Sequence, residues 1–238
     1  MAANAVATAI KVGLVDSALA AGCAGQFSSY HCAEFNPQLI SASAVHASAV
    51  CARWAELGKN IELYNAVLFD DSLRCQQAHL VAALNWLLEC QVATIHMSLG
   101  VRQPSAELTT VCAQLTARGT LLVASAPAQG APVYPAQFDG VISATGDARC
   151  QPGQHSQLAP VNHSGENRGP QFGGCVYSDQ HSLRGASIGA GAVTAQLLKL
   201  QIAAEQPLNH TTALSMLAAG AHYRGREQRS QPAAGGLA

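Results

Sequence analysis

Three short stretches carry an aspartate, a histidine and a serine in an order that suits acyl-transfer chemistry. Asp16 ends the apolar run at 11–15, and His46 opens a run of small residues at 47–52. Ser187 follows a glycine and an alanine, directly before a segment with a helical pattern. A carboxylate can orient an imidazole, the imidazole can accept a proton, and the hydroxyl can then attack a carbonyl carbon. Because each residue falls where a strand ends or a helix starts, all three lie where α/β sheets build their sites.

The stretches around these residues resemble the motifs of the subtilisin-like serine peptidases, the subtilases. Where that family has Asp-Ser/Thr-Gly, residues 16–18 read Asp-Ser-Ala. Its motif His-Gly-Thr-x-Val-Ala is matched by His-Ala-Ser-Ala-Val-Cys-Ala at 46–52. Its motif Gly-Thr-Ser-Met-Ala-x-Pro is matched by Gly-Ala-Ser-Ile-Gly-Ala-Gly at 185–191. Met-Ser-Leu-Gly at 97–100 and Tyr-Pro-Ala at 134–136 match two further family segments, in the same chain order.

The resemblance runs from about residue 11 to about residue 221 and implies roles for particular side chains. Ser187 would be the nucleophile, His46 the general base, and Asp16 the carboxylate that orients the imidazole. The backbone N–H of Ser187 would donate one hydrogen bond to the oxyanion. Two segments would line the pocket for the residue before the scissile bond: Ser98, Leu99 and Gly100, and Ser125, Ala126 and Pro127.

The sequence departs from the family where a second oxyanion donor is expected. In place of Ala-Gly-Asn-x-Gly, residues 126–130 read Ala-Pro-Ala-Gln-Gly, which puts Ala128 at the position of the donating asparagine. The loss of one such donor costs roughly 10²–10³-fold in turnover, a magnitude established in this same family. Gln129, which follows that position, and Asn162, in the loop before the serine, are the candidates for a substitute donor.

Two other departures bear on the site. Gly191 replaces the proline that ends the serine motif, and His96 replaces the asparagine before Met-Ser-Leu-Gly. We expect His96 to pack within the sheet, with a position facing the cleft as the alternative. These differences leave open a catalytically dead subtilase fold that binds peptides. The retention of Asp16, His46 and Ser187 argues against it, because a protein that no longer catalyses has no chemical reason to keep all three.

Strand-like and helix-like patterns alternate along the chain. Strands are expected at 11–15, 61–68, 92–98, 120–125 and 139–144, and helices at about 42–57, 73–90, 104–118, 187–204 and 210–221. The alternation predicts an α/β fold, a three-layer αβα sandwich with a mainly parallel, doubly wound sheet. Residues 146–183, rich in Gly, Pro, Gln and His, are expected to form a long irregular stretch that leads to the serine. We expect a single domain over 1–223 and a disordered tail over 224–238.

The composition excludes several partners and cofactors. Only 11% of the 238 residues are charged, and the formal net charge is −1, so no basic stripe exists for nucleic acid. No apolar run reaches the roughly 18 residues of a membrane span. The first ten residues carry no Lys or Arg and leave no room for a signal or pro-segment, so a cytoplasmic location is expected. In a chain of this length without a signal segment, the eight cysteines are expected to be reduced thiols. They form no Cys-x-x-Cys pair, and no metal and no cofactor are expected.

The resemblance can be narrowed within the family. In its small size, many cysteines and degenerate motifs, the chain is similar to the peptidases that remove the leader from the cross-linked small subunit of bacterial quinohemoprotein amine dehydrogenase. This similarity implies a peptidase dedicated to maturation, with a precursor polypeptide as its partner and the enzymes that modify the precursor as further candidate partners. A general intracellular subtilase is the alternative within the enzyme class. A nucleotide-binding α/β domain is a third reading, but G-x-G-x-x-G does not follow the first strand and no G-x-x-x-x-G-K-[ST] occurs. The oligomeric state stays open.

Overall fold

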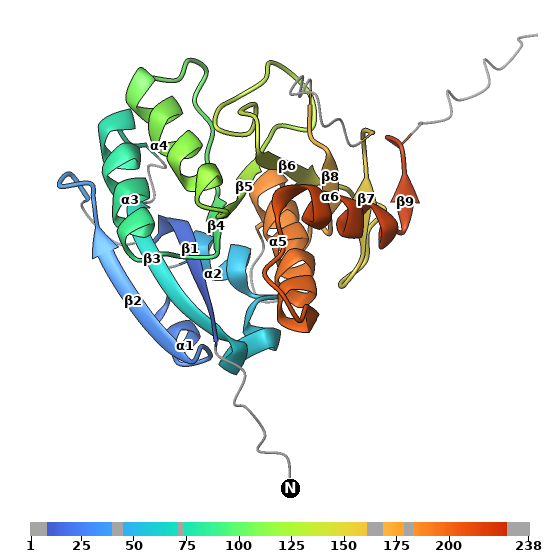
Figure 1. Ribbon diagram of the computed structural model, residues 1–238, viewed down its shortest axis with the longest axis horizontal. Helices are drawn as coiled ribbons and strands as arrows, with labels where there is room; N and C mark the ends of the chain where they lie inside the picture. Colours follow the sequence, from blue (N-terminus) through green and yellow to red (C-terminus); the bar gives the residue numbers. More distant parts are fainter. Residues whose placement is uncertain (1–8, 40–44, 71–73, 161–168, 179–182, 228–238) are drawn as a thin grey trace, which may run out of the picture.

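A computed structural model describes residues 9–39, 45–70, 74–160, 169–178 and 183–227. A nine-stranded sheet forms its centre (Figure 1). The strands lie in the order β2-β3-β1-β4-β5-β6-β8-β7-β9. Within this sheet only the pair β7–β8 is antiparallel, and all other neighbours are parallel. The predicted α/β fold with a mainly parallel sheet is confirmed.

The five central strands come from the apolar runs of the sequence. They are β1 (Ile10–Ser17), β3 (Ile61–Phe69), β4 (Thr94–Met97), β5 (Leu121–Ser125) and β6 (Val141–Gly146). Their side chains are buried almost throughout, because helices cover both faces of the sheet. All five predicted strands are therefore present, with ends that differ by a few residues.

Four strands were not predicted, because none of them is a long apolar run. They are β2 (Ser29–Glu34), β7 (His155–Gln157), β8 (Phe172–Gly174) and β9 (Tyr223–Arg224). β2 is an edge strand with polar, partly exposed side chains. β7 and β8 interrupt the stretch that was expected to be irregular. β9 crosses the expected start of the disordered tail. Arg224 is held there, since its guanidinium donates to the side chain of Gln157 at 2.6 Å and to the carbonyl of Ala218 at 3.1 Å.

Six α-helices occur in the described parts of the chain: α1 (Ala21–Ala24), α2 (Val45–Cys51), α3 (Gln77–Glu89), α4 (Ala106–Ala117), α5 (Ala186–Ala203) and α6 (His210–Ala219). The predicted helix over 42–57 is wrong at its end, because α2 stops at Cys51. A 3₁₀ helix, Ala55–Asn60, follows it, and Gly58 has a φ of +31° inside this segment. That conformation breaks the helix and turns the chain toward β3.

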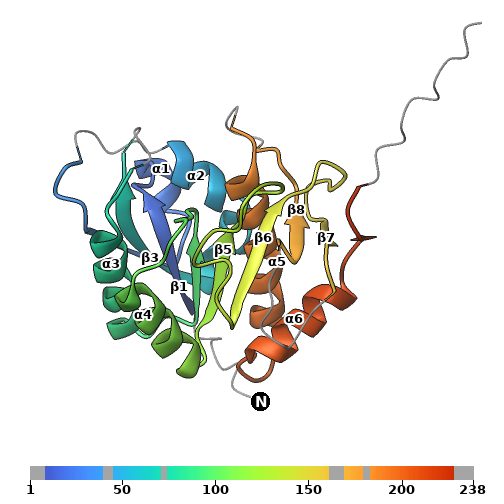
Figure 2. The same cartoon turned by 90° about the horizontal axis from the view of Figure 1, so that it is seen from above.

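The helices form two layers, one on each face of the sheet (Figure 2). α3 and α4 pack on one face, against Leu122 and Ala124 of β5. α5 and α6 pack on the other, against Leu121 and Val123 of the same strand. Alternate residues of one strand thus serve both cores, as a sheet buried on both faces requires. α2 shares the face of α5, where the buried Trp54 donates its indole N–H to the carbonyl of Gly191 at 2.9 Å.

The cysteines and the longer helices bear on two further expectations. All eight cysteines are free, and Cys51, Cys112, Cys150 and Cys175 are buried. The expectation of unpaired thiols therefore agrees with the structure. Among the helices described, none combines the length and the apolar character needed to cross a bilayer.

Candidate active site

The carboxylate of Asp16 and the imidazole of His46 form a buried hydrogen-bonded pair. Asp16 lies near the carboxyl end of β1 and is fully buried. One carboxylate oxygen, Oδ1, accepts from the backbone N–H of Ser17 at 2.6 Å and from Nδ1 of His46 at 2.7 Å. Because a carboxylate can only accept, Nδ1 carries the hydrogen and Nε2 keeps its lone pair. The imidazole is thereby oriented to take a proton at Nε2.

Ser17 connects the strand that carries Asp16 to the helix that carries His46. Its hydroxyl oxygen accepts from the backbone N–H of Ala47 at 3.2 Å, in the first turn of α2. A second hydroxyl, that of Ser48, accepts from the N–H of Ala20, in the segment after β1, at 3.0 Å. These bonds replace the backbone partners that the start of a helix lacks. They also fix the start of α2 against the end of β1.

Two opposing effects set the proton affinity of His46. Partial burial lowers the pKa of the imidazole, since the charged form loses water. The hydrogen bond and the negative charge of Asp16 raise the pKa by more, so the net pKa is above the ordinary 6.5. Asp16 therefore stabilises the imidazolium that forms when His46 accepts a proton.

Ser187 is the second residue of α5 and is half-buried. Gly185 precedes the helix with a φ of +134°, a backbone conformation that L side chains rarely adopt. At this first turn the backbone N–H groups have no partner within the helix, and the helix dipole favours negative charge. No hydrogen bond joins the Ser187 hydroxyl to His46 in the described part of the chain. Such bonds are often long before substrate binds.

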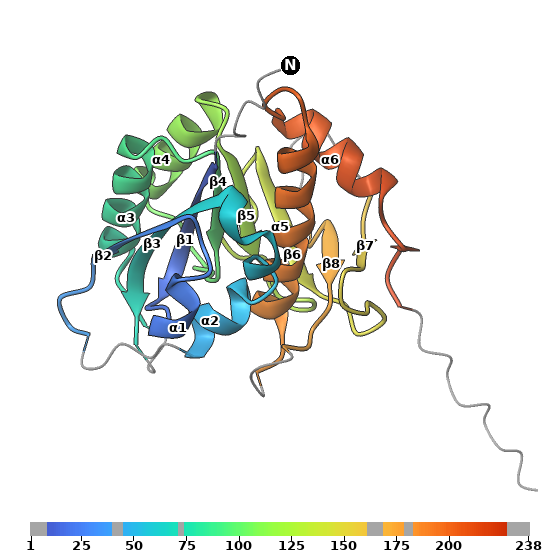
Figure 3. The same ribbon diagram turned by 90° about the horizontal axis from the view of Figure 1, so that it is seen from below.

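α2 and α5 pack closely, which brings the helix of His46 beside the helix of Ser187 (Figure 3). Gly191 faces α2 so closely that a Cβ at this position would lie 2.4 Å from the carbonyl oxygen of Val50. A proline ring, as in the family motif, would have no space there. The replacement of that proline by Gly191 thus has a steric reason in this chain.

The two segments expected to bind substrate leave the same edge of the sheet. Ser98, Leu99 and Gly100 follow β4, while Ser125 ends β5 and leads into Ala126 and Pro127. β4 and β5 are parallel neighbours, so both segments emerge at the carboxyl edge, where Asp16 also lies. Both are attached to the sheet: Ser98 donates its N–H to Val15 at 3.4 Å, and Ala126 donates to Ala144 at 2.8 Å. Their role in binding stays a prediction.

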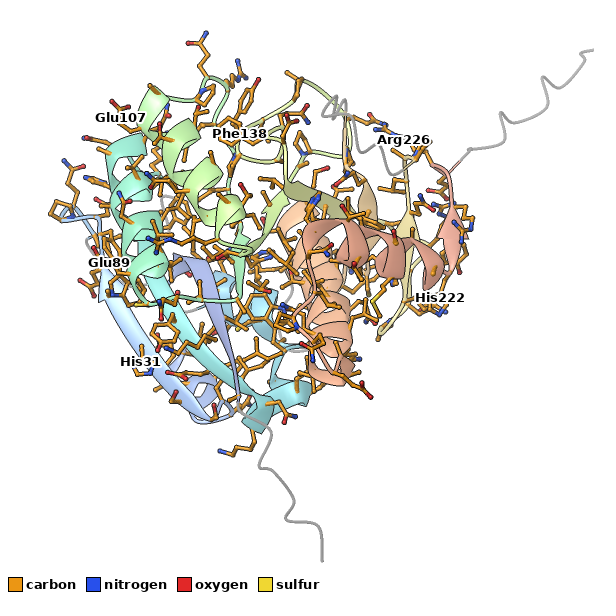
Figure 4. All side chains as sticks on the ribbon, viewed as in Figure 1. His31, Glu89, Glu107, Phe138, His222 and Arg226 are labelled. Atoms are coloured by element: carbon orange, nitrogen blue, oxygen red, sulfur yellow. The ribbon has the colours of Figure 1, made fainter. Side chains whose placement is uncertain are left out.

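Ala128 and Gln129 are exposed on the loop after β5. Both line a hollow of about 640 Å³ that Thr145 and Gly146 also border. Asn162 lies outside the described residues. Sequence reasoning missed Arg226, which follows β9 at the rim of the molecule (Figure 4). Its guanidinium donates to the carbonyl oxygen of Ala128 at 3.3 Å.

His96 is fully buried in β4, as expected, and its ring nitrogens contact two hydroxyl groups. No cluster of three or more His, Cys, Asp or Glu side chains that could hold a metal ion occurs among the residues described. Acyl transfer by an aspartate, a histidine and a serine needs no metal ion.

The strand order and the two helix layers match an α/β fold of the subtilisin type. The chain is similar to the solved structure of Sphericase, with a TM-score of 0.61 and 16% sequence identity. The match covers 90% of this chain and 83% of that protein. The sequence matches no protein-family model and no curated protein.

Proposed function

We propose that this protein is a serine endopeptidase that hydrolyses a peptide bond through an acyl-enzyme. The observation that carries the proposal is the 2.7 Å hydrogen bond between His46 Nδ1 and the buried Asp16. It holds the imidazole at the start of α2, a helix that packs against α5, and Ser187 lies in the first turn of α5. The likeness of the fold to Sphericase supports the same reading.

In the proposed reaction, Ser187 Oγ attacks the peptide carbonyl carbon while its proton passes to Nε2 of His46. Asp16 stabilises the resulting imidazolium, and the backbone N–H of Ser187 together with the dipole of α5 stabilises the oxyanion. The C–N bond then breaks, and the proton on Nε2 passes to the leaving amine. A water molecule, activated by the same imidazole, hydrolyses the acyl-enzyme and restores Ser187.

The finer proposal is a dedicated peptidase that removes a leader from a modified precursor in the cytoplasm. The cross-linked small subunit of quinohemoprotein amine dehydrogenase is the example that the motif resemblance suggests. Ala128 supports a dedicated role, because a site with one fewer oxyanion donor is slow unless substrate binding offsets the loss. A general intracellular subtilase is the alternative.

A peptide-binding module without activity is the second candidate function. The side chain at Ala128 cannot donate, and Ser187 makes no hydrogen bond to His46 in the described structure. Such a module would hold peptides along the segments after β4 and β5 without cleaving them. Reaction of Ser187 with a covalent probe separates the two candidates.

Labelling with a fluorophosphonate, read by intact mass, is the decisive experiment. We expect one adduct on the wild-type protein, none on Ser187→Ala, and one on Ser29→Ala, which changes a serine on the edge strand β2. No adduct on the wild type, under conditions that label an active serine peptidase, would favour the binding module.

Substrate range tests the finer proposal. A dedicated peptidase should cut its cognate precursor at one position and leave casein and short chromogenic peptides nearly intact. Broad digestion of casein at rates typical of serine peptidases would instead identify a general peptidase.

A further inference from the structure

A chain of hydrogen bonds through the buried His96 joins α5, the sheet and the segment that follows β4. Nδ1 of His96 lies 2.8 Å from Thr194 Oγ1 on α5, and Nε2 lies 3.0 Å from Ser98 Oγ. The ring is fully buried and packs edge-on against Trp54, with ring centroids 5.4 Å apart. His96 thus contacts the helix of the nucleophile, the core beside α2 and the first residue after β4.

The hydrogens in this chain have one consistent arrangement. The Thr194 hydroxyl donates its single hydrogen to the carbonyl of Ala190 at 3.0 Å, so it can only accept from His96. Nδ1 of His96 must then carry a hydrogen, which leaves Nε2 of the neutral ring as an acceptor. The Ser98 hydroxyl must therefore donate to Nε2. Both lone pairs of the Ser98 oxygen can then accept hydrogen bonds from other partners.

The neutral state of the ring keeps this arrangement in place near pH 7. Burial lowers the pKa of His96 to about 4; the negative charge of Asp16 opposes this shift, and the charge of His46 adds to it. At neutral pH the ring therefore carries one hydrogen, and Nε2 remains an acceptor.

Ser98 is the first residue after β4, in the segment expected to bind substrate. In the register of β1 and β4, Leu14 is opposite His96 and Val15 is opposite Met97, so Ser98 comes beside Asp16. Leu14 belongs to the core between the sheet, α2 and α5. Paired residues of neighbouring strands share a face, so His96 and Ser98 lie on that same face. Ser98 is half-buried, whereas His96 is not exposed at all.

We propose that His96 is a positioning residue that fixes the Ser98 hydroxyl with its lone pairs toward the cleft, so that Ser98 accepts a hydrogen bond from a backbone N–H of the peptide substrate. This inference rests on the proposed peptidase function. It makes the direction of one hydrogen bond in the cleft depend on a histidine that never touches substrate.

Thr194→Val tests the arrangement, because valine keeps the shape of threonine but cannot accept from Nδ1. The hydrogen should then move to Nε2, which donates to Ser98 and turns the serine hydrogen toward the cleft. Thr194→Ser is the matched control, since it keeps the hydroxyl.

Nitrogen-15 NMR of histidine-labelled protein reports the position of the hydrogen, and His96→Asn assigns the signal. We expect hydrogen on Nδ1 in the wild type and Thr194→Ser, and on Nε2 in Thr194→Val. Hydrogen on Nε2, or a doubly protonated ring, in the wild type at pH 7 would overturn the inference.

Two covalent reagents test the effect on substrate. A peptidyl phosphonate needs the cleft as well as Ser187, whereas a small alkyl fluorophosphonate needs mainly Ser187. The rate with the peptidyl reagent, divided by the rate with the alkyl reagent, should fall roughly fivefold or more in Thr194→Val, as expected for one lost hydrogen bond. In Thr194→Ser the ratio should stay close to that of the wild type.

The ratio could stay unchanged in Thr194→Val, either because neither rate changes or because both rates fall equally. Either result would mean that the chain of hydrogen bonds is only structural. A wild-type protein that reacts with neither reagent would remove the proposed peptidase function and, with it, the role of Ser98 toward substrate. The NMR signal would still decide the hydrogen position on His96. The two failures are therefore distinguishable.

Discussion

At the scale of single residues, Asp16 orients the imidazole of His46 and raises its pKa. The carboxylate is fully buried, and one of its oxygens accepts two hydrogen bonds, from Ser17 and from His46. No described residue donates to the other oxygen, Oδ2. A buried carboxylate held in this way favours a positive partner, and the raised pKa of His46 follows from it.

The first prediction concerns the pH dependence of Ser187 labelling. His46 accepts a proton only when it is neutral, so the rate should fall as the pH drops through the pKa of His46 and level off above it. Because Asp16 raises that pKa, the midpoint should lie above 6.5. In Asp16→Asn the midpoint should move to lower pH, and the plateau should drop by roughly 10⁴-fold, as in related triads. A midpoint below 6.5 in the wild type would contradict the assignment of His46 as the base.

The second prediction concerns the oxyanion. If Gln129 substitutes for the missing asparagine, Gln129→Ala should lower kcat roughly 10²-fold with little change in KM, because the bond strengthens only in the transition state. Gln137→Ala is the matched control, since Gln137 lines a second hollow that Gln129 also borders, beside Pro132 and Val133. Asn162→Ala tests the other donor. Unchanged turnover in both variants and in the double variant would exclude both side chains, and Ala128→Asn should then raise turnover.

At the scale of elements, the sequence allowed prediction of whatever has a long apolar pattern. β1, β3 and α5 have such a pattern. The polar residues at the ends of these elements could therefore also be placed in order along the chain. β2 could not be predicted, because its exposed side chains serve an edge rather than a core. β9 and Arg226 depend on contacts with distant residues, as in the bond from Arg226 to the carbonyl of Ala128. No local signal in a sequence records such a contact.

The third prediction concerns the contact between α2 and α5. In Gly191→Ala the new Cβ would meet the Val50 carbonyl at 2.4 Å, so the helices must move apart. Overpacking of this kind costs about 1–3 kcal/mol of unfolding free energy. Labelling of Ser187 should also slow, because the helices that carry Ser187 and His46 separate.

Gly22→Ala, in α1, is the matched control, since nothing lies within 4 Å of its new Cβ. Its urea unfolding and labelling rate should stay close to those of the wild type. Equal behaviour of the two variants would show that the α2–α5 contact does not hold the site together.

At the scale of the whole molecule, the site lies where the strand order changes direction. From β1 the chain builds β3 and β2 on one side and then β4, β5 and β6 on the other (Figure 1). Connections leave the carboxyl ends of β1 and β4 in opposite directions, and crevices for ligands form at such points. The pair of Asp16 and His46 was predictable from the motifs at the end of β1 and the start of α2, and the structure joins the two by a hydrogen bond. The role of Ser187 beside them stays a prediction. The His96 chain was not predictable, because it depends on Thr194, which is 98 residues away.

The fourth prediction is that acid destabilises the protein through His96 and not through His46. The pKa of His96 is about 4 in the folded state and 6.5 when exposed, so its stabilising contribution is present above pH 6.5 and is lost as the pH falls toward 4. The pKa of His46 is raised, so its contribution is complete below pH 6.5 and is lost only as the pH rises through that pKa.

Urea unfolding of the wild type should therefore show a loss of about 1–3 kcal/mol of unfolding free energy between pH 6.5 and 4. His96→Asn should reduce this loss without abolishing it, because burial also lowers the pKa of His155. His46→Ala should leave it unchanged, and an equal loss in His96→Asn and the wild type would show that His96 is not the group that titrates.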